Sequence, residues 1–308
     1  MAKVLVTGGA GFIGSNLVRA LAERGDEVRV LDNFSTGFRA NLEGVDVEIV
    51  EGELRSYERV HNAVRGTELV YHLGALGSVP RSVQDPLTSN AVNVEGTLNV
   101  LLAGRDENVR RVVFASSTSV YGTNPPLPTR EDERLDPISP YGVAKLAAER
   151  YCGAFSRVYE AFETVVLRYF NVYGPRQSPS SQYAAVIPLF IAAIAAGEPV
   201  TVYGDGEQSR DFTYVDDAVA ATIAAGEADG ASGHAFNVAG GKPASVNEVA
   251  DTIGRLLGKP VERELAPRRA GDIRDSHADL TAAREVLGYE PQVELDEGLR
   301  RTIQFLGG

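Results

Sequence analysis

The stretch that decides the fold is Val4-Leu5-Val6-Thr7-Gly8-Gly9-Ala10-Gly11-Phe12-Ile13-Gly14, near the amino terminus. A short apolar run stops at glycines and leads into residues with helical periodicity, which predicts a strand, a tight turn and a helix. Gly8 permits the turn, Gly11 lets backbone N–H groups approach a diphosphate, and Gly14 lets the helix pack on the sheet. Asp32 ends the next predicted strand, where a carboxylate binds ribose hydroxyls. The pattern predicts a dinucleotide-binding unit.

The residues around Asp32 also indicate which dinucleotide binds. A carboxylate there repels the extra phosphate of NADP, and Asn33 follows it where an arginine would neutralise that phosphate. We therefore predict NAD. The alternative, a glycine-rich turn without a ligand, is disfavoured because strand, helix and acid occur in the order that binding requires.

Composition excludes several classes of protein. The 308 residues contain 30 Lys and Arg against 42 Asp and Glu, a formal net charge of −12, which disfavours nucleic-acid and anionic membrane partners. A single cysteine, Cys152, cannot form an internal disulfide, and the four histidines show no ligand spacing, so we expect no metal site. No apolar run approaches the ~18 residues of a membrane helix, and no signal peptide precedes the first strand. We expect a cytoplasmic protein.

The alternation of short β-branched runs with helical segments predicts an α/β fold, a doubly wound parallel (Rossmann) sheet with a smaller α/β substrate-binding domain. We expect the NAD-binding domain over residues 1–170, with later segments able to return to it, and the substrate domain over 171–308. Beyond Asn171 we expect loops to dominate, with a buried helix at 184–196 and a solvated connection or lid at 177–182. Predicted strands span 3–7, 27–31, 46–51, 69–72, 111–115 and 164–169, and predicted helices span 12–24, 57–64, 88–106 and 143–159.

A tyrosine and a lysine lie four residues apart just after Pro140. On one helix face the phenol of Tyr141 and the ammonium of Lys145 are neighbours, so the tyrosine can serve as a base. A phenol titrates near pH ~10, and reaching the neutral range takes about three pKa units, or about 4 kcal/mol. Lys145 and an oxidised nicotinamide can supply this shift together. A surface pair without chemistry is the alternative.

Hydroxyl residues follow the strand predicted at 111–115. The turn Ser116-Ser117-Thr118-Ser119-Val120-Tyr121-Gly122 lies at the carboxyl edge of the sheet, where ligands bind in this architecture. One hydroxyl can bond a sugar hydroxyl and help pass its proton to Tyr141. A solvated turn is the alternative. A serine hydrolase is excluded because the chain lacks the Gly-x-Ser-x-Gly elbow.

Further motifs extend this pattern over nearly the whole chain. With the glycine turn, the Ser117 turn and Tyr141-Gly-Val-Ala-Lys145, they are Arg168-Tyr-Phe-Asn-Val-Tyr-Gly-Pro-Arg176 and Gly204-Asp-Gly-Glu-Gln-Ser-Arg-Asp-Phe-Thr-Tyr-Val-Asp-Asp217. Together they resemble an extended short-chain dehydrogenase/reductase of the nucleotide-sugar epimerase branch. The resemblance implies a tightly held NAD that takes a hydride from carbon 4 of a UDP-hexose while Tyr141 removes the hydroxyl proton. The 4-keto sugar then rotates and receives the hydride on its other face.

The resemblance also implies a role for particular residues and a homodimer formed through helices such as 88–106 and 143–159. The catalytic residues would be Tyr141, Lys145 and Ser117. Arg210 and Arg269 would bind the diphosphate, with Asp272 on the uridine ribose. The cofactor would contact Gly8, Gly11, Phe12, Ile13, Gly14, Asp32, Asn33, Ser35, Thr36, Gly37, Glu53, Leu54, Leu73, Gly74, Ala75, Asn93, Ser116, Tyr141, Lys145 and Tyr169. The UDP-sugar would contact Ser78, Ser117, Thr118, Tyr141, Asn171, Val186, Tyr203, Arg210, Arg269, Asp272 and Ser276.

Departures from the family pattern narrow the reaction. Glu53 replaces the usual aspartate near the adenine, which leaves that contact open. Thr118-Ser119 stands where related dehydratases carry Asp-Glu, so no acid pair is present to expel the 6-hydroxyl. Related glucuronate decarboxylases place a glutamate at Ser119, and glucuronate epimerases carry threonine and arginine at Asn171 and Ser178. Dehydration and uronate chemistry are disfavoured.

The choice of substrate sugar is predicted mainly from one small residue, Ser276. Ser276 stands where the family has a tyrosine that restricts the pocket to plain hexoses, and the stretches 77–82 and 183–188 resemble N-acetylhexosamine epimerases. We predict interconversion of UDP-N-acetylglucosamine and UDP-N-acetylgalactosamine as well as of UDP-glucose and UDP-galactose. The alternatives are an epimerase restricted to plain hexoses, a UDP-glucuronate epimerase or decarboxylase, a reductase that releases its cofactor, and a dinucleotide sensor without chemistry.

Overall fold

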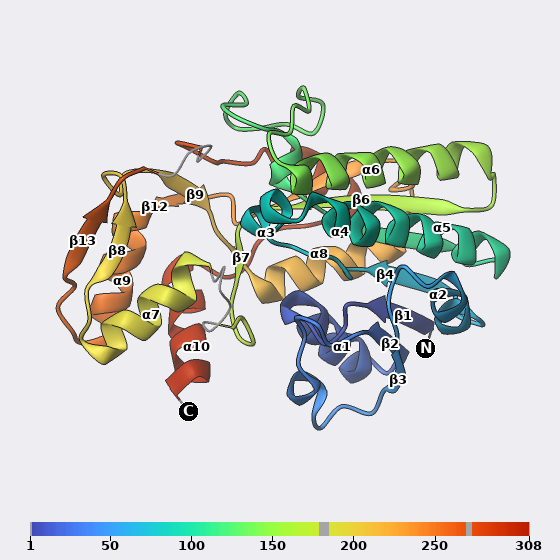
Figure 1. Ribbon diagram of the computed structural model, residues 1–308, viewed down its shortest axis with the longest axis horizontal. Helices are drawn as coiled ribbons and strands as arrows, with labels where there is room; N and C mark the ends of the chain where they lie inside the picture. Colours follow the sequence, from blue (N-terminus) through green and yellow to red (C-terminus); the bar gives the residue numbers. More distant parts are fainter. Residues whose placement is uncertain (1, 179–184, 269–272, 308) are drawn as a thin grey trace.

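A seven-stranded parallel sheet organises the larger part of the molecule (Figure 1). The computed structural model describes residues 2–178, 185–268 and 273–307. The strand order is β11-β6-β5-β4-β1-β2-β3, and every pair is parallel. The strands are β1 (Lys3–Thr7), β2 (Glu27–Asp32), β3 (Glu48–Glu51), β4 (Leu69–His72), β5 (Arg111–Ser117), β6 (Glu163–Tyr169) and β11 (Ala235–Val238). The predicted fold class is confirmed.

Helices cover both faces of this sheet. Alternate side chains of a strand point to opposite faces, so Val4 and Val6 of β1 join one apolar core while Leu5 joins the other. One core contains α1 (Phe12–Arg24) and α8 (Val215–Glu227), and the other contains α2 (Tyr57–Val64), α5 (Gly96–Asp106) and α6 (Pro140–Val158). Burial on both faces explains why the strands are continuous apolar runs.

The two long predicted helices differ from the observed ones in instructive ways. The segment predicted as one helix at 88–106 consists of α4 (Pro86–Asn90), a π-helical turn η2 (Ala91–Glu95) and then α5. The helix predicted at 143–159 begins three residues earlier, because Ser139 caps it and Pro140 occupies its first position. Tyr141 is therefore part of the first helical turn.

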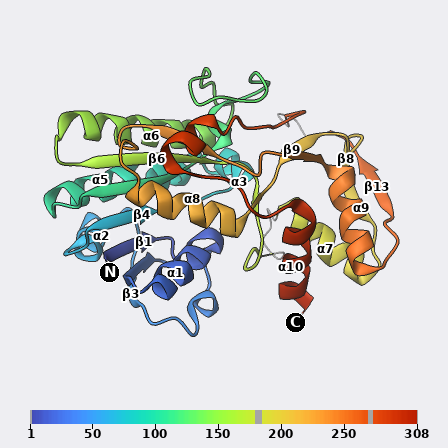
Figure 2. The same cartoon turned by 180° about the vertical axis from the view of Figure 1, so that it is seen from behind.

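The remaining part of the molecule is a smaller α/β region, seen on the left of Figure 1 and from behind in Figure 2. Strand β8 pairs in parallel with β13, β9 pairs antiparallel with β12, and β7 pairs in parallel with β10. Helices α7 and α9 pack against each other. The bounds are β7 (Val172–Tyr173), α7 (Val186–Ala196), β8 (Val200–Tyr203), β9 (Ser209–Asp211), β10 (Thr213–Tyr214), β12 (Pro243–Ser245), α9 (Val246–Leu257), β13 (Arg263–Ala266) and α10 (Leu295–Gly307).

The expectation that loops dominate beyond Asn171 is wrong. Helices α8, α9 and α10 were missed, although α9 carries a readable capping box formed by Ser245 and Glu248. Strand β11 and helix α8 return to the central sheet and its face, across a long sequence separation. The helix predicted at 184–196 is α7, and residues 179–182 of the predicted lid region lie outside the described part. The division of the chain at residue 170 stays a prediction.

The remaining short elements are α3 (Val79–Gln84), η1 (Arg39–Leu42), η3 (Thr118–Val120) and η4 (Ala283–Leu287). Of these, α3 and η3 matter for the site, because α3 and η3 both pack against α6. The predicted strand at 46–51 begins only at Glu48, and the strand predicted at 111–115 continues to Ser117. The hydroxyl of Ser117 thus belongs to the last residue of β5.

Candidate active site

A cavity of about 780 Å³ runs along the carboxyl edge of the central sheet. Its walls come from the residues that end or follow strands β1 to β6, which is where ligands bind in open α/β sheets. Gly8, Asp32, Leu73, Ser116 and Tyr169 mark five of these strand ends.

The glycine turn is shaped for close contact. Gly8 has a φ of +70°, and a Cβ there would lie 2.7 Å from the Cα of Gly74. A Cβ on Gly14 would lie 2.1 Å from the carbonyl oxygen of Gly8, so the helix packs directly on the turn. Helix α1 begins after Gly11 with no side-chain cap and no acidic residue in its first turn. Its first N–H groups therefore suit a diphosphate, and the predicted NAD fits.

Asp32 is held in a fixed orientation at the end of β2. Its Oδ2 accepts a hydrogen bond from the backbone N–H of Ala10 at 2.9 Å, and its Oδ1 accepts one from Phe34 at 2.8 Å. The carboxylate and the neighbouring Asn33 both line the cavity. Its free lone pairs suit ribose hydroxyls and its charge repels a phosphate, as the preference for NAD requires.

All but two of the predicted cofactor residues line this cavity. Gly37 instead packs on the glycine turn, where a Cβ would lie 2.7 Å from the carbonyl carbon of Ala10. Asn93 is buried and brackets Leu76: its Oδ1 accepts from the Leu76 N–H at 2.9 Å, and its amide donates to the Leu76 oxygen at 3.2 Å. Asn93 thus holds the loop after β4 that forms part of the wall.

A directed chain of hydrogen bonds supports the same loop. The hydroxyl of Thr97 donates to the carbonyl of Asn93 at 2.7 Å, so it must accept from Nε2–H of His72, 3.0 Å away. Nδ1 of His72 then accepts from the hydroxyl of Thr7 at 2.6 Å, and that oxygen accepts from the Gly74 N–H at 3.1 Å. This series of hydrogen bonds is that of a neutral His72, in which Nε2 carries the proton and Nδ1 accepts from the hydroxyl of Thr7.

Tyr141 and Ser117 are brought together by the start of α6. The hydroxyl of Ser139 accepts from the Gly142 N–H at 3.1 Å, and a Cβ on Gly142 would lie 2.6 Å from the Ser119 oxygen. The first turn of α6 therefore lies directly on the turn that follows β5. Ser82 of α3 fixes the other side, since its hydroxyl accepts from the Tyr141 N–H at 3.1 Å.

Burial is the largest influence on the pKa values of Tyr141 and Lys145. Burial raises the pKa of Tyr141 to about 12, although its hydrogen bond with Ser117 lowers the pKa in part. Burial also lowers the pKa of Lys145 to about 8. The Nζ of Lys145 donates to the Ala115 oxygen at 2.8 Å and lies 5.8 Å from the centre of the Tyr141 ring. The chain alone therefore does not make this phenol acidic, and further positive charge in the cavity is needed.

A second cavity of about 270 Å³ adjoins the first, because Ala185 lines both. Four predicted substrate residues line it: Asn171, Val186, Tyr203 and Arg210. The first of these has a φ of +28°, an uncommon backbone conformation that the surrounding structure must hold in place.

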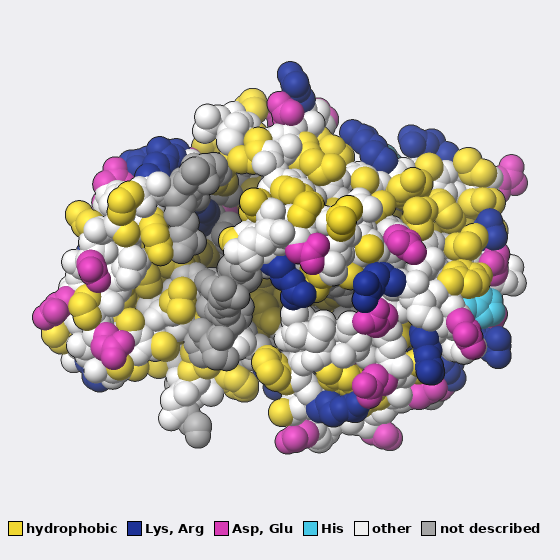
Figure 3. All heavy atoms as spheres, viewed as in Figure 1, with side chains coloured by type: hydrophobic (Ala, Val, Ile, Leu, Met, Phe, Trp, Pro, Cys, Tyr) yellow, Lys and Arg dark blue, Asp and Glu magenta, His cyan; other side chains and the backbone are white. Residues whose placement is uncertain are grey.

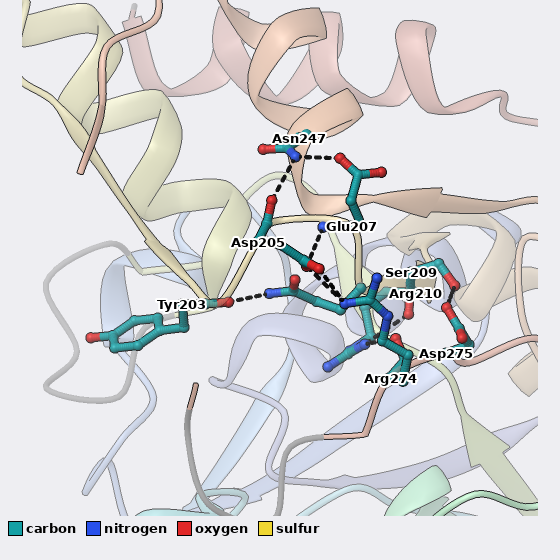
Figure 4. A network of polar contacts seen from close by, with 9 residues as sticks. Tyr203, Asp205, Glu207, Ser209, Arg210, Asn247, Arg274 and Asp275 are labelled. Atoms are coloured by element: carbon teal, nitrogen blue, oxygen red, sulfur yellow. Dashed lines mark hydrogen bonds and ion pairs between the residues drawn. The ribbon is translucent and has the colours of Figure 1, made fainter. Parts of the chain in front are cut away.

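Arg210 is oriented by a polar network (Figure 4). Its guanidinium donates to the backbone oxygens of Ser209 at 2.7 Å and of Arg274 at 3.3 Å. Arg274 in turn forms an ion pair with Asp205, in which its Nη1 lies 2.7 Å from Oδ1 and 3.0 Å from Oδ2 of the carboxylate. Ser209 donates to Asp275 at 2.7 Å, which ties β9 to the segment that begins at residue 273.

The other predicted substrate residues are placed differently. Ser78 lines the large cavity, whereas Ser117 and Thr118 line neither cavity among the described residues. Ser276 is buried and also lines neither cavity, although the neighbouring Asp275 bonds β9. The predicted residues Arg269 and Asp272 lie outside the described part of the chain.

Part of the wall of the large cavity was not predicted from the sequence. Helix α3 contributes Arg81 and Gln84, and η2 contributes Val92. The sequence signal was weak, because α3 is a short helix of 6 residues that contains Pro80 and is soon followed by Pro86. Within the described ranges, no helix is long and apolar enough to cross a membrane, and no group of three or more His, Cys, Asp or Glu side chains is arranged to hold a metal ion.

The fold and the site define an α/β enzyme with a dinucleotide cradle beside a partly buried tyrosine and serine and a buried lysine. Residues 4–239 match the model of the NAD dependent epimerase/dehydratase family, and the chain belongs to this family. The UDP-glucose 4-epimerase of Mycolicibacterium smegmatis is 42% identical, with 98% of each chain covered.

Two solved structures are similar throughout. The UDP-N-acetylglucosamine 4-epimerase of Methanobrevibacter ruminantium, solved with UDP-N-acetylmuramic acid, has a TM-score of 0.94 and 39% identity, covering 99% of this chain and 98% of that one. The UDP-glucose 4-epimerase of Thermus thermophilus, solved with NAD, has a TM-score of 0.91 and 38% identity, covering 99% of each chain. The predictions of the family, of NAD and of an enzyme of the isomerase class are confirmed.

The buried imidazole of His72 predicts an acid-sensitive stability. Burial lowers its pKa to about 3, whereas an unfolded histidine binds a proton below about pH 6.5. Acid therefore favours the unfolded chain, and we expect His72 to account for a loss of about 2 to 3 kcal/mol in the free energy of unfolding between about pH 6.5 and 4.5. Urea unfolding of wild type and H72Q at both pH values measures it. Equal pH dependence in the two proteins would contradict the prediction.

Proposed function

We propose that this enzyme interconverts the C4 epimers of UDP-hexoses through a transient 4-keto sugar. The observation that carries the proposal is Tyr141, which lines a cavity suited to NAD and interacts with Ser117, next to a second cavity lined by Arg210. A sugar that reaches from the second cavity toward Tyr141 would bring its hydroxyl to the phenol. NAD, when bound, supplies a reversible hydride acceptor.

The residues of the chain would divide the remaining work. Tyr141 would take the proton of the 4-hydroxyl as the C4 hydrogen leaves, and return it in the second half of the cycle. Ser117, already hydrogen-bonded to the phenol, would hold the sugar oxygen and help move that proton. Lys145 would favour the phenolate by its positive charge. Arg210, whose guanidinium is fixed by two backbone oxygens, would bind the diphosphate together with Arg269.

Two rival functions make different demands on the same residues. A dinucleotide sensor has no use for a buried tyrosine paired with a serine and a lysine. A reductase consumes its cofactor, so it must release NAD after each turnover, whereas an epimerase regenerates it in place. Mass analysis of the purified protein separates these two enzymes, because we expect NAD to copurify with an epimerase.

Tyr141 provides the direct test of the mechanism. We expect Y141F to lower kcat by about 10²- to 10⁴-fold, because the base is removed, and S117A to lower it less. Both variants should still bind NAD, since the cradle is untouched. The control is Y159F, a tyrosine at the far end of α6, which should retain full activity. Epimer ratios read by NMR give the rates, and substantial turnover by Y141F would refute the proposed base.

We further propose that the enzyme accepts UDP-N-acetylglucosamine and UDP-N-acetylgalactosamine as well as UDP-glucose and UDP-galactose. The support is the small residue Ser276 at the position where the family resemblance implies a pocket-restricting tyrosine, next to Asp275, which bonds β9. Comparable similarity to a UDP-glucose epimerase and a UDP-N-acetylglucosamine epimerase is consistent with both pairs. The alternatives are an epimerase restricted to plain hexoses, and a UDP-glucuronate epimerase or decarboxylase.

Substrate range is tested by comparing kcat/KM on the two sugar pairs and on UDP-glucuronate. We expect turnover of both hexose pairs, and a selective loss of the acetamido pair in S276Y because the larger ring removes space. Since Ser276 is buried, the thermal midpoint of S276Y is measured in parallel, and S276A serves as the matched small control. Absence of acetamido turnover in the wild type would refute this part of the proposal.

We also propose that the enzyme is a homodimer. Exposed apolar side chains gather on α3, α4 and α6 and form what we call the apolar patch: Val83, Leu87, Val143 and Tyr151. Figure 3 shows hydrophobic side chains over α6 on this face. Leu87 is 82% exposed, which is unusual for a leucine on a helix in contact with other helices. Burial of this patch against a second copy would remove it from water.

A charge in the apolar patch should weaken the dimer. We expect L87D to raise the dimer dissociation constant by more than about tenfold, because an aspartate would be buried without a partner. The control is L265D on β13, where the leucine is 67% exposed but lies in the smaller region. Sedimentation velocity at several concentrations measures both. A monomeric wild-type enzyme at micromolar concentration would contradict the proposal.

A further inference from the structure

Helix α6 carries a third buried charged residue, one turn beyond Lys145. Glu149 is only 8% exposed, and its two oxygens accept three hydrogen bonds from side chains. Ser116 donates to Oε1 at 2.5 Å, and Arg168 donates from Nε to Oε1 at 3.1 Å and from Nη2 to Oε2 at 2.9 Å. Three side-chain donors thus converge on one buried carboxyl group.

Lys145 and Glu149 both attach helix α6 to strand β5. Lys145 donates to the backbone oxygen of Ala115 at 2.8 Å, and Glu149 accepts from the side chain of Ser116, the next residue of β5. In the sheet, Ser116 is paired in register with Arg168 of β6. Two successive turns of α6 are therefore fixed to two successive residues of one strand, directly behind the cavity wall.

The arginine of this cluster does not depend on Glu149 alone. Arg168 also donates to the hydroxyl of Tyr121 at 2.9 Å and to the backbone oxygen of Glu131 at 2.8 Å. These bonds hold the guanidinium on the side of the carboxylate that faces β6. Lys145 lies one helical turn away on the same helix, so the carboxylate stands near both cations.

We propose that Glu149 is a positioning residue for the active site, which keeps the buried Lys145 protonated and holds its ammonium against strand β5 beside Tyr141. This inference rests on the proposed role of Lys145. It assigns Glu149 a function beyond the ion pair with Arg168, since the state of the lysine determines how much positive charge reaches the phenol.

The electrostatics of Lys145 agree with this assignment. Burial is the largest influence and lowers the pKa of the ammonium to about 8, while the charge of Glu149 opposes the fall. Removing that carboxylate should therefore lower the pKa of Lys145 further. Less positive charge would then stand beside Tyr141. The phenol depends on that charge, because burial raises its pKa to about 12.

Other titratable groups lie around the lysine and must be considered in any pH experiment. Tyr141 and Cys152 share its helix, His72 of β4 is close enough to feel its charge, and Arg168 of β6 lies behind Glu149. The helices that pack against α6 add Arg81, Asp85, Glu95 and Arg105.

The direct test measures the protonation of Lys145 itself in the NAD-loaded enzyme. The sequence has four lysines, so side-chain NMR of protein labelled at lysine gives few signals, and the spectrum of K145M assigns the one of interest. We expect E149Q to lower the pKa of Lys145 by about one unit or more, which reduces the protonated fraction at pH 7.5 about threefold. E149D should recover part of the shift, because it restores the charge.

A matched control separates this effect from loss of a buried ion pair. Arg111 and Glu163 form a partly buried ion pair at the opposite ends of the same two strands, with 2.6 Å between Nε and Oε2. E163Q should lower the thermal midpoint and leave the pKa of Lys145 unchanged. If E149Q does not fold, E149Q/R168Q replaces it, because two amides can bond each other without leaving an unpaired buried charge. The double variant should still lower the pKa of Lys145, because Glu149 raises that pKa and Arg168 is not among the charges that act on it.

The outcomes distinguish this inference from the proposed function. An unchanged Lys145 pKa in E149Q, or in the double variant where that one is used, would refute the role of Glu149 and leave it as a structural partner of Arg168. A lowered pKa with an unchanged pH profile of kcat would support Glu149 but refute the proposed role of Lys145. A lowered pKa together with a descending alkaline limb displaced to lower pH supports both. The NMR measurement needs no turnover, so it holds whichever sugar is the substrate.

Discussion

The site depends on how one helix is attached to one strand. The first turn of α6 rests on the turn after β5, where Gly142 has no room for a side chain against the Ser119 oxygen. The next turns are held by Lys145 on Ala115 and by Glu149 on Ser116. Because these contacts are buried and short, they fix the phenol of Tyr141 beside Ser117 rather than leaving it on a mobile loop. Moving α6 by one turn would separate every functional group of the site.

Burial that stabilises this arrangement also opposes the chemistry. The apolar surroundings raise the pKa of Tyr141 to about 12 and lower the pKa of Lys145 to about 8, and both shifts disfavour the charged forms. The cofactor cavity offers a remedy, since an oxidised nicotinamide brings a positive charge to the same place. In the proposed mechanism, activation of Tyr141 as a base would be coupled to binding of the cofactor. A negatively charged chain gains from this coupling, because the positive charge is delivered only where it is needed.

In the proposed mechanism, the larger cavity would hold NAD and the smaller one would hold part of the UDP-sugar. The larger cavity follows the strand ends of the parallel sheet and is lined by the glycine turn, Asp32 and Tyr141. The smaller one is built from β7, α7, β8, β9 and α9, and its arginine is oriented by a network that reaches the segment after residue 273.

The sequence by itself determined the dinucleotide cradle, the NAD preference and the pair Tyr141 and Lys145, because these depend on residues within one turn or one strand of each other. The same reasoning missed β11, α8 and α9, whose places are decided by packing against strands and helices distant in the chain. The predicted contacts of Asn93 and Gly37 with the cofactor stay predictions, since both residues pack against the cavity wall without lining the cavity. Only the tertiary structure joined Glu149 to Ser116 and Arg168, since those residues meet through strand register and helix packing. Local pattern fixes which groups are available, and long-range burial decides their contacts and their charge.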